Sequence, residues 1–514
     1  MKRGVDLPAL KPAVDPTLPA NRKQMEQWLA TDGTGDVARR IKAVYALLKG
    51  WNQAPLDDNN RFVLLEQIKP AVAEIVSGLD RHYAGLDQPL PLPNRKIALS
   101  LGKLLFEYGL GYQRLAHALV DSTSRFDRSG ITAMAHYRVM ELACQRMMVF
   151  FRAYLSLPTG LWRDAHTIYL RSRELEIESQ SFDGQQTISQ LYLAMVLLEL
   201  ADPYRLIAGG IDQVHDYVLQ NLRLCTIGSG VGAERKTGHF VVHFGIDAGA
   251  SEVGDLVLRK DEDGILVDTS QLVKTIHQQL TDLAQVTPAE DQRYQQKQRV
   301  VMLRCLVVAF ALRPNRQQDR RSERRKVWVV RGVKPVHHCL ASGEVVDRVT
   351  ELHLGDTGTP VEVSGQSSPG LALQPDHWEI LDVSVGGLAL LRDSSGRSRI
   401  MIGDLLGVAD DAHGPWQTFM VRRVRYVDEE DMVVGVQKLE GKVSALKVVG
   451  GEPGERSPAL LYQPAGDDKD SLLLPPGNWH SGDKIVTDQA PAQTVVLGRV
   501  LELTRQFELY ELSD

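Results

Sequence analysis

The chain has 514 residues, 43% of them hydrophobic, and carries a formal net charge of −6. This length is too great for one compact core and predicts about three domains. The negative charge argues against a protein that coats nucleic acid over its whole surface, because that function requires a broad basic footprint. We therefore expect no nucleic-acid partner and only local affinity for phosphate groups.

Residues 1–20 are expected to be a loose leader, because prolines interrupt them and they contain no apolar stretch of signal-peptide length. Residues 21–224 are predicted to form an all-helical bundle of seven or eight helices. Apolar residues recur there at a spacing of three to four, and proline and glycine mark the breaks. One such stripe consists of Leu64, Leu65, Ile68, Val72, Ile75, Val76 and Leu79.

Residues 225–312 form a mixed α/β region, in which short runs with β character such as 239–246 are followed by a helical pattern after Asp268 and Ser270. The segment at 295–312 fits either a helix or a buried strand. Its apolar run, Val300–Leu312, is interrupted by Arg304 and is shorter than the roughly 20 residues of a membrane-spanning helix, so we expect no integral membrane segment.

From Lys326 onward, short β-type runs alternate with turn residues, a pattern that is typical of an antiparallel barrel. Residues 313–446 are assigned to this barrel and its arginine-rich lead-in. Residues 447–514 are a β-rich extension, either a second small β-unit or a continuation of the barrel. The predicted fold class is therefore multidomain α+β.

The four cysteines do not form a CxxC pair and indicate neither a disulfide framework nor a zinc module: Cys144, Cys225, Cys305 and Cys339. We expect a reducing, cytoplasmic location. His337, His338 and Cys339 fall on a predicted strand, where adjacent side chains point to opposite faces, so they are not expected to hold one metal ion. We expect no metal site, no cofactor and no catalytic residues.

Two motifs carry the functional prediction. The run RPNRQQDRRSERRK, residues 313–326, is dense in arginine although the chain is acidic overall, and it directly precedes the first predicted barrel strand. The sequence DVSVGG, residues 382–387, lies between two apolar runs, so that a strand enters and leaves a tight polar turn. Taken singly, the arginine-rich run could be a soluble linker, and DVSVGG could be an ordinary hairpin turn.

Together, RRSERR and DVSVGG resemble the motifs RxxxR and (D/N)xSxxG of the PilZ family, whose members bind cyclic di-GMP. The resemblance extends over residues 313–446, where MIGDLLGV, VRRVRYV and MVVGVQKL are similar to the closing strands of the family. It implies a β-barrel that binds cyclic di-GMP through residues of the two motifs: Arg320, Arg321, Arg324, Arg325, Asp382, Ser384 and Gly387. The motifs lie further apart than is usual in the family, and the surplus falls in residues 355–376.

Two overlapping pairs satisfy RxxxR, Arg320 with Arg324 and Arg321 with Arg325, and we favour the second. Guanidinium groups bond bidentately to guanine O6 and N7 and neutralise phosphates. Asp382 could accept hydrogen bonds from guanine N1–H and N2–H₂. Ser384 could donate to a phosphate or support the turn, and Gly387 would allow close approach of backbone to ligand.

No GGDEF or EAL signature for making or degrading the dinucleotide is present, so the chain is predicted to be a receptor and not an enzyme. The first hypothesis is an effector for motility, biofilm or exopolysaccharide processes. In it, the lead-in becomes ordered on the ligand, the domains rearrange, and a protein partner docks on the helical region. The alternatives are a PilZ-like scaffold that does not bind, and an enzyme with a site in residues 225–312. The glycine-rich stretch 228–238 is expected to be a loop, because Arg235 stands where a phosphate-binding loop requires glycine.

Overall fold

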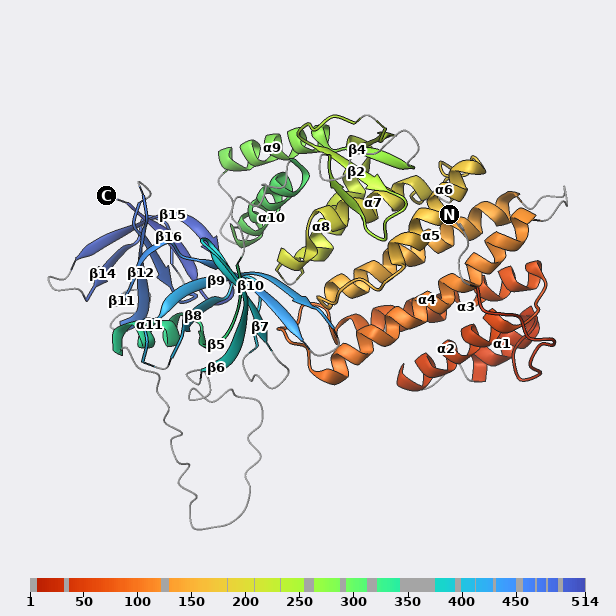
Figure 1. Cartoon of the computed structure of the whole chain (residues 1–514), viewed down its shortest axis with the longest axis horizontal. Helices are drawn as coiled ribbons and strands as arrows, with labels where there is room; N and C mark the ends of the chain where they lie inside the picture. The colour runs from red at the N-terminus through yellow and green to blue at the C-terminus, as the bar shows by residue number, and fades with distance from the viewer. Residues whose placement is uncertain are drawn as a thin grey trace, which may run out of the picture. The chain divides into compact units, whose positions relative to one another are not determined.

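The computed structural model describes residues 7–31, 37–121, 129–182, 184–207, 209–231, 233–253, 263–286, 293–311, 321–342, 375–392, 399–411, 413–428, 431–449, 456–466, 469–477, 479–488 and 493–513 (Figure 1). The chain divides into two compact units. The first comprises Met1–Leu86 with Leu90–Asn315, and the second comprises Asp87–Pro89 with Arg316–Asp514. Helices dominate the first unit and antiparallel strands the second, which confirms the α+β class. Within these ranges, no helix is both long and apolar enough to cross a membrane.

The predicted helical region is confirmed, and its described part contains eight α-helices. These are α1 (Arg22–Thr31), α2 (Val37–Gln53), α3 (Asp58–Asp80), α4 (Leu92–Asp121), α5 (Ser129–Arg152), α6 (Leu161–Glu174), α7 (Ile188–Leu200) and α8 (Gly210–Asn221). The long helices α4 and α5 pack along each other, and α5 also contacts α6 and α7. Short 3-10 turns at Pro203–Arg205 and Leu222–Leu224 flank α8.

Local sequence explains two of these helices. Asp57 caps α3 by accepting the backbone N–H of Asn60 at 3.0 Å, and the buried side of α3 contains most of the apolar stripe found in the sequence. Helix α7 is buried on nearly all sides and begins with a capping box between Thr187 and Gln190. A helix that is apolar all round belongs inside a core, and α7 is the central helix of this unit.

His166 on α6 is buried, with 1% of its surface exposed. Its Nδ1 lies 2.7 Å from the Tyr192 hydroxyl and its Nε2 lies 3.0 Å from the carbonyl oxygen of Ala248. Burial lowers the pKa of His166 to about 4, since the charged imidazolium loses its hydration. This imidazole therefore remains neutral in the folded chain at neutral pH.

The first unit also contains a four-stranded antiparallel sheet with the order β1-β4-β2-β3. Its strands are β1 (Thr226–Ser229), β2 (His239–His243), β3 (Ala250–Glu252) and β4 (Gly264–Asp268), followed by helices α9 (Ser270–Gln285) and α10 (Arg293–Ala311). The apolar run that fitted a helix or a strand is therefore the helix α10. Gly228 and Ser229, expected in a loop, end the strand β1.

The predicted barrel is present in the second unit as six strands that close in the order β10-β7-β6-β5-β8-β9. They are β5 (Arg321–Arg331), β6 (Asp376–Ser384), β7 (Gly387–Arg392), β8 (Leu405–Ala409), β9 (Gln417–Tyr426) and β10 (Met432–Lys438). Strand β5 begins at Arg321, five residues before the expected start. The arginines from 321 to 325 are thus already part of a strand and not of a lead-in that precedes it.

One strand prediction is wrong. Residues Val333–Ser342, which include His337, His338 and Cys339, form the helix α11. Gly332, with φ +94°, ends β5, and the buried residues Val333, Val336 and Cys339 then recur at a helical spacing of three.

The β-rich extension is a second closed barrel of six strands, in the order β11-β12-β13-β16-β15-β14. They are β11 (Gly441–Val449), β12 (Arg456–Pro464), β13 (Ser471–Leu474), β14 (Lys484–Thr487), β15 (Thr494–Leu503) and β16 (Glu508–Ser513). Of the two possibilities that the sequence left open, a second β-unit is the one observed.

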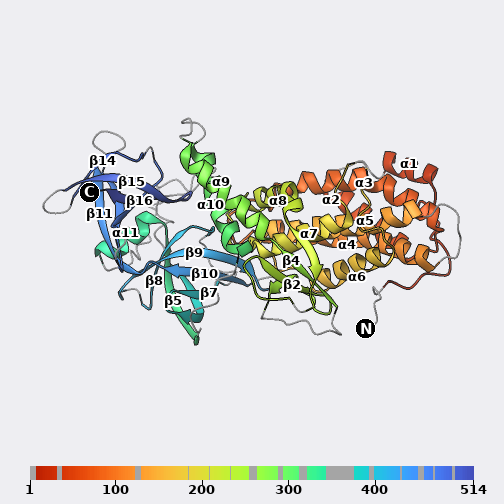
Figure 2. The same cartoon turned by 90° about the horizontal axis from the view of Figure 1, so that it is seen from above.

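The two barrels share packed surfaces. Helix α11 contacts β5 and β8 of the first barrel and β11 and β12 of the second. Figure 2 shows α11 beside β11 and β8. One buried cluster combines Val336 of α11 and Met420 of β9 with Phe507, which directly precedes β16. Arg422 of β9 also donates two hydrogen bonds to the Glu502 carboxylate of β15, at 2.6 and 3.0 Å. The barrels therefore form one body.

Candidate functional site

The two sequence motifs meet on neighbouring strands of the first barrel. In the pairing of β5 with β6, Arg321 lies opposite Val383 and Ser322 lies opposite Asp382. A β-bulge follows between Ser322 and Arg325, and such bulges strengthen the local twist and redirect side chains. Arg320 lies outside the described residues. The predicted surplus at 355–376 lies outside the described residues as far as 374, and the strands that carry the two motifs are adjacent.

The DVSVGG sequence forms the hairpin turn between β6 and β7. Ser384 pairs with Gly387, and the Ser384 hydroxyl donates to the Gly387 carbonyl oxygen at 3.1 Å. Val385 at the tip is 74% exposed. Of the two roles considered for Ser384, supporting the turn is therefore observed.

Gly387 is required by the barrel itself. A Cβ at this position would lie 2.1 Å from the carbonyl oxygen of Val436 and 3.1 Å from its carbonyl carbon, both on the β10 backbone. Real side chains do not approach backbone so closely, so glycine lets β10 pair with β7 at this point. The close approach expected for Gly387 is thus made by a neighbouring strand.

The three described arginines of the RxxxR region differ in their surroundings. Arg321 is exposed and makes no ion pair with the part of the chain that the structure describes. The Arg324 side chain is 73% exposed, and its Nη1 lies 3.4 Å from Glu379 Oε1. Arg325 is more enclosed and is held by two carboxylates, with its Nε 2.8 Å from Glu323 Oε1 and its Nη1 paired with Asp410.

Cross-strand pairing places Asp382 in a row that crosses five strands. Residues directly opposite each other point to the same face of a sheet. The successive pairs run from β5 through β6, β7 and β10 to β9: Ser322, Asp382, Ala389, Gly435 and Arg423.

This row faces away from the barrel core. Its neighbours on the same strands, Leu390, Val434 and Val424, are fully buried, and adjacent residues of a strand point to opposite faces. In this row, Ala389 and Gly435 are the residues between Asp382 and Arg423. Both are small, so no large side chain of the row separates the Asp382 carboxylate from the Arg423 guanidinium. Sequence reasoning missed Arg423. The alternation of Arg423 and Arg425 with buried Val424 and Tyr426 marks an outward cationic edge.

Two tryptophans of this barrel are not available as a stacking surface. Trp378 and Trp416 are 2% and 8% exposed and pack in the core or at its rim. Within the described ranges, no group of three or more His, Cys, Asp or Glu side chains could hold a metal ion.

Residues 23–232 match the family model of the cyclic-di-GMP receptor FimW, N-terminal domain. The match spans α1 to α8 and β1, so both barrels lie outside it. No curated protein and no solved structure matches the chain. The helical part is therefore similar to a domain of a cyclic-di-GMP receptor, while the barrels are described by their motifs and geometry alone.

Proposed function

We propose that this chain is a non-enzymatic receptor for cyclic di-GMP, with a PilZ-like first barrel that binds the dinucleotide and an N-terminal unit that engages a protein partner. Arg321 and Asp382 are 61 positions apart in sequence but lie one register position apart on the adjacent strands β5 and β6, and this proximity is the observation that carries the proposal. The match of residues 23–232 to a receptor domain supports it independently, because that match does not include the two motifs.

The chemistry of the outward row suits a guanine base. Asp382 would accept from N1–H and N2–H₂ on one edge of the base, and Arg423 would donate to O6 and N7 on the other. Three strand spacings of about 4.8 Å separate their backbones, a span that two side chains and one base can fill. Guanine is selected over adenine, which presents an N6–H₂ donor where guanine presents the O6 acceptor.

The arginines of β5 would neutralise the phosphates. Arg321 is available without breaking an ion pair to any described residue, whereas Arg325 would have to leave Glu323 or Asp410. An exposed ion pair costs little to exchange, about 0–1 kcal/mol, so Arg325 can still join the ligand. Arg320 and Arg324 would contribute to the positive potential around the site.

Coupling to a partner would act through the start of β5. Arg321 directly follows the segment in which the first unit ends and the second begins. A ligand that engages Arg321 and its sequence neighbours would bias the orientation of the two units, and the partner would respond to that change. Arg321 to Lys326 lie in strand β5, and the rest of the predicted lead-in, 313–320, lies outside the described residues.

Titration calorimetry on the full chain tests the binding proposal. Wild type should bind cyclic di-GMP and should bind cyclic di-AMP at least tenfold more weakly. Asp382→Ala should lose more than tenfold in affinity, because a charge-assisted contact is worth more than about 1.4 kcal/mol. Glu440→Ala, which removes an exposed carboxylate between the barrels, is the matched control and should bind as wild type.

A second function, a PilZ-like scaffold that binds no dinucleotide, is favoured by the contacts of three motif residues. The fold alone accounts for Gly387 and Ser384, and Arg325 already has two carboxylate partners. No heat of binding from wild type in the same titration would select this scaffold.

A further inference from the structure

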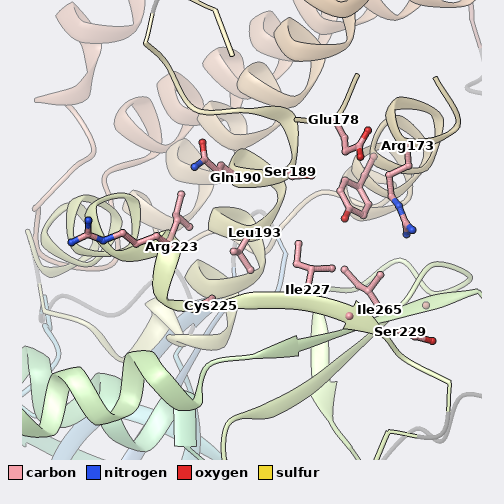
Figure 3. A pocket seen from close by; sticks show the side chains of 14 residues that line it. Arg173, Glu178, Ser189, Gln190, Leu193, Arg223, Cys225, Ile227, Ser229 and Ile265 are labelled. Atoms are coloured by element: carbon pink, nitrogen blue, oxygen red, sulfur yellow. The ribbon is translucent and has the colours of Figure 1, made fainter. Parts of the chain in front are cut away.

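A groove of about 700 Å³ lies in the first unit between helices α6 and α7 and the strands β1 and β4, of which β1 is the edge strand (Figure 3). Its middle is apolar, with Leu193 of α7 facing Ile227 of β1 and Ile265 of β4. Its ends are polar: Arg223 lies at one end, and Arg173 and Glu178 lie at the other. Nothing in the dinucleotide site involves these residues.

One wall of the groove is the face of the sheet at β1 and β4, where Ser229 lies opposite Ile265. Strand β1 pairs with β4 and, among the described strands, is the terminal one in the order β1-β4-β2-β3. In an antiparallel edge strand, every second residue directs its N–H and C=O away from its partner strand. The edge carries no bulky shield, because a Cβ at Gly228 would meet nothing within 4 Å and Ser229 is small and exposed.

The charged side chains at the ends have no ion-pair partner within the described part of the chain. Arg173 and Arg223 are exposed and form no ion pair with described residues, although Arg173 lies 6.0 Å from the Tyr169 ring centre. The Glu178 Oε2 atom is buried and has no hydrogen-bond partner there. A buried carboxylate oxygen without a donor is costly, so its position is suited to a donor supplied by a ligand.

We propose that this groove binds an extended peptide segment of a partner protein, which adds a strand to the open edge of β1. Main-chain hydrogen bonds to β1 would supply affinity, and alternate side chains would supply specificity. An apolar side chain would enter between Leu193 and Ile227. An acidic side chain would pair with Arg223 or Arg173, and a backbone N–H would reach Glu178.

The inference rests on the proposed engagement of a protein partner by the N-terminal unit, and it names the surface and the chemistry of that partner. It does not depend on dinucleotide binding. The assay below contains no cyclic di-GMP, so its failure and a failure of the dinucleotide site are separate results.

The probe is a phage-displayed library of random 12-residue peptides, selected on the full-length chain. Selected peptides should share an apolar residue and an Asp or Glu at alternating positions. Fluorescence anisotropy with the best peptide should show at least a tenfold loss of affinity for the variant with Arg173→Glu and Arg223→Glu. Arg205→Glu reverses an exposed arginine of the same unit outside the groove and should leave the affinity unchanged.

Amide hydrogen exchange of the full chain supplies the readout specific to strand addition. Saturating peptide should slow exchange within Thr226–Ser229 of β1. The proposal is overturned if the library yields no binding peptide, if the double variant binds as wild type, or if β1 exchange is unchanged while the peptide is bound. The last result would assign the groove to a ligand held by side chains alone.

Discussion

Gly387→Ala tests whether the glycine of the turn motif serves the barrel. The added Cβ would lie 2.1 Å from the Val436 carbonyl oxygen, and contacts under 3.0 Å are essentially never observed, so the β10 backbone would have to move by close to 1 Å. Forced shifts of this kind cost about 1–3 kcal/mol. In a unit of roughly 200 residues, each kcal/mol lowers the melting temperature by about 2–4 °C. We therefore expect the barrel transition of Gly387→Ala to fall by roughly 2–12 °C.

Differential scanning calorimetry of the full chain measures this shift. Gly78→Ala is the matched control, because a Cβ there meets nothing within 4 Å and the residue lies inside helix α3. This control should melt at or slightly above the wild-type temperature. A Gly387→Ala variant that melts as wild type but loses cyclic di-GMP would refute the structural role and assign the glycine to the ligand.

Three further outcomes are expected. Arg321→Ala should weaken cyclic di-GMP binding about tenfold in calorimetry, whereas Arg324→Ala should change it by less than threefold; the reverse order would select the other RxxxR register. The pKa of His166 is about 4 in the folded chain and about 6.5 in the unfolded chain. As the pH falls, the unfolded chain therefore binds a proton at this histidine before the folded chain does. Lowering the pH from 6.5 to 4 should reduce the free energy of unfolding by about 3 kcal/mol. Urea unfolding should show this slope in wild type and a flatter one in His166→Gln; parallel slopes would contradict the buried neutral imidazole. A double-mutant cycle on Arg422 and Glu502 should give a coupling of about 1 kcal/mol, and a value near zero would deny this pair a part in joining the barrels.

Much of the helical architecture could be predicted, because burial leaves a periodic signal in the sequence. The stripe from Leu64 to Leu79 becomes the buried side of α3. The run at 295–312 could not be assigned, since a mostly apolar segment carries little periodicity. Helix α11 was missed because Val333, Val336 and Cys339 follow a strand closely, and only the positive φ of Gly332 marks the break between them.

The sequence was enough to predict which strands carry the candidate site. It was not enough to predict which side chains align across those strands. The motifs alone predicted that Arg321 and Asp382 share a site, and the strands that carry them, β5 and β6, are paired. Arg423 could not be found in this way. Its alignment with Asp382 depends on pairing across four strands and on bulges that shift the register, which a linear pattern does not contain.

Photo-crosslinking tests whether cyclic di-GMP binds the outward face of the first barrel. The full chain would be irradiated with 8-azido cyclic di-GMP, digested, and mapped by mass spectrometry, with excess unlabelled cyclic di-GMP as competitor. We expect competitor-sensitive label on peptides from β5, from the turn between β6 and β7, and from β9 around Arg423. Competitor-sensitive label confined to residues 23–232, the part similar to a receptor domain, would contradict it.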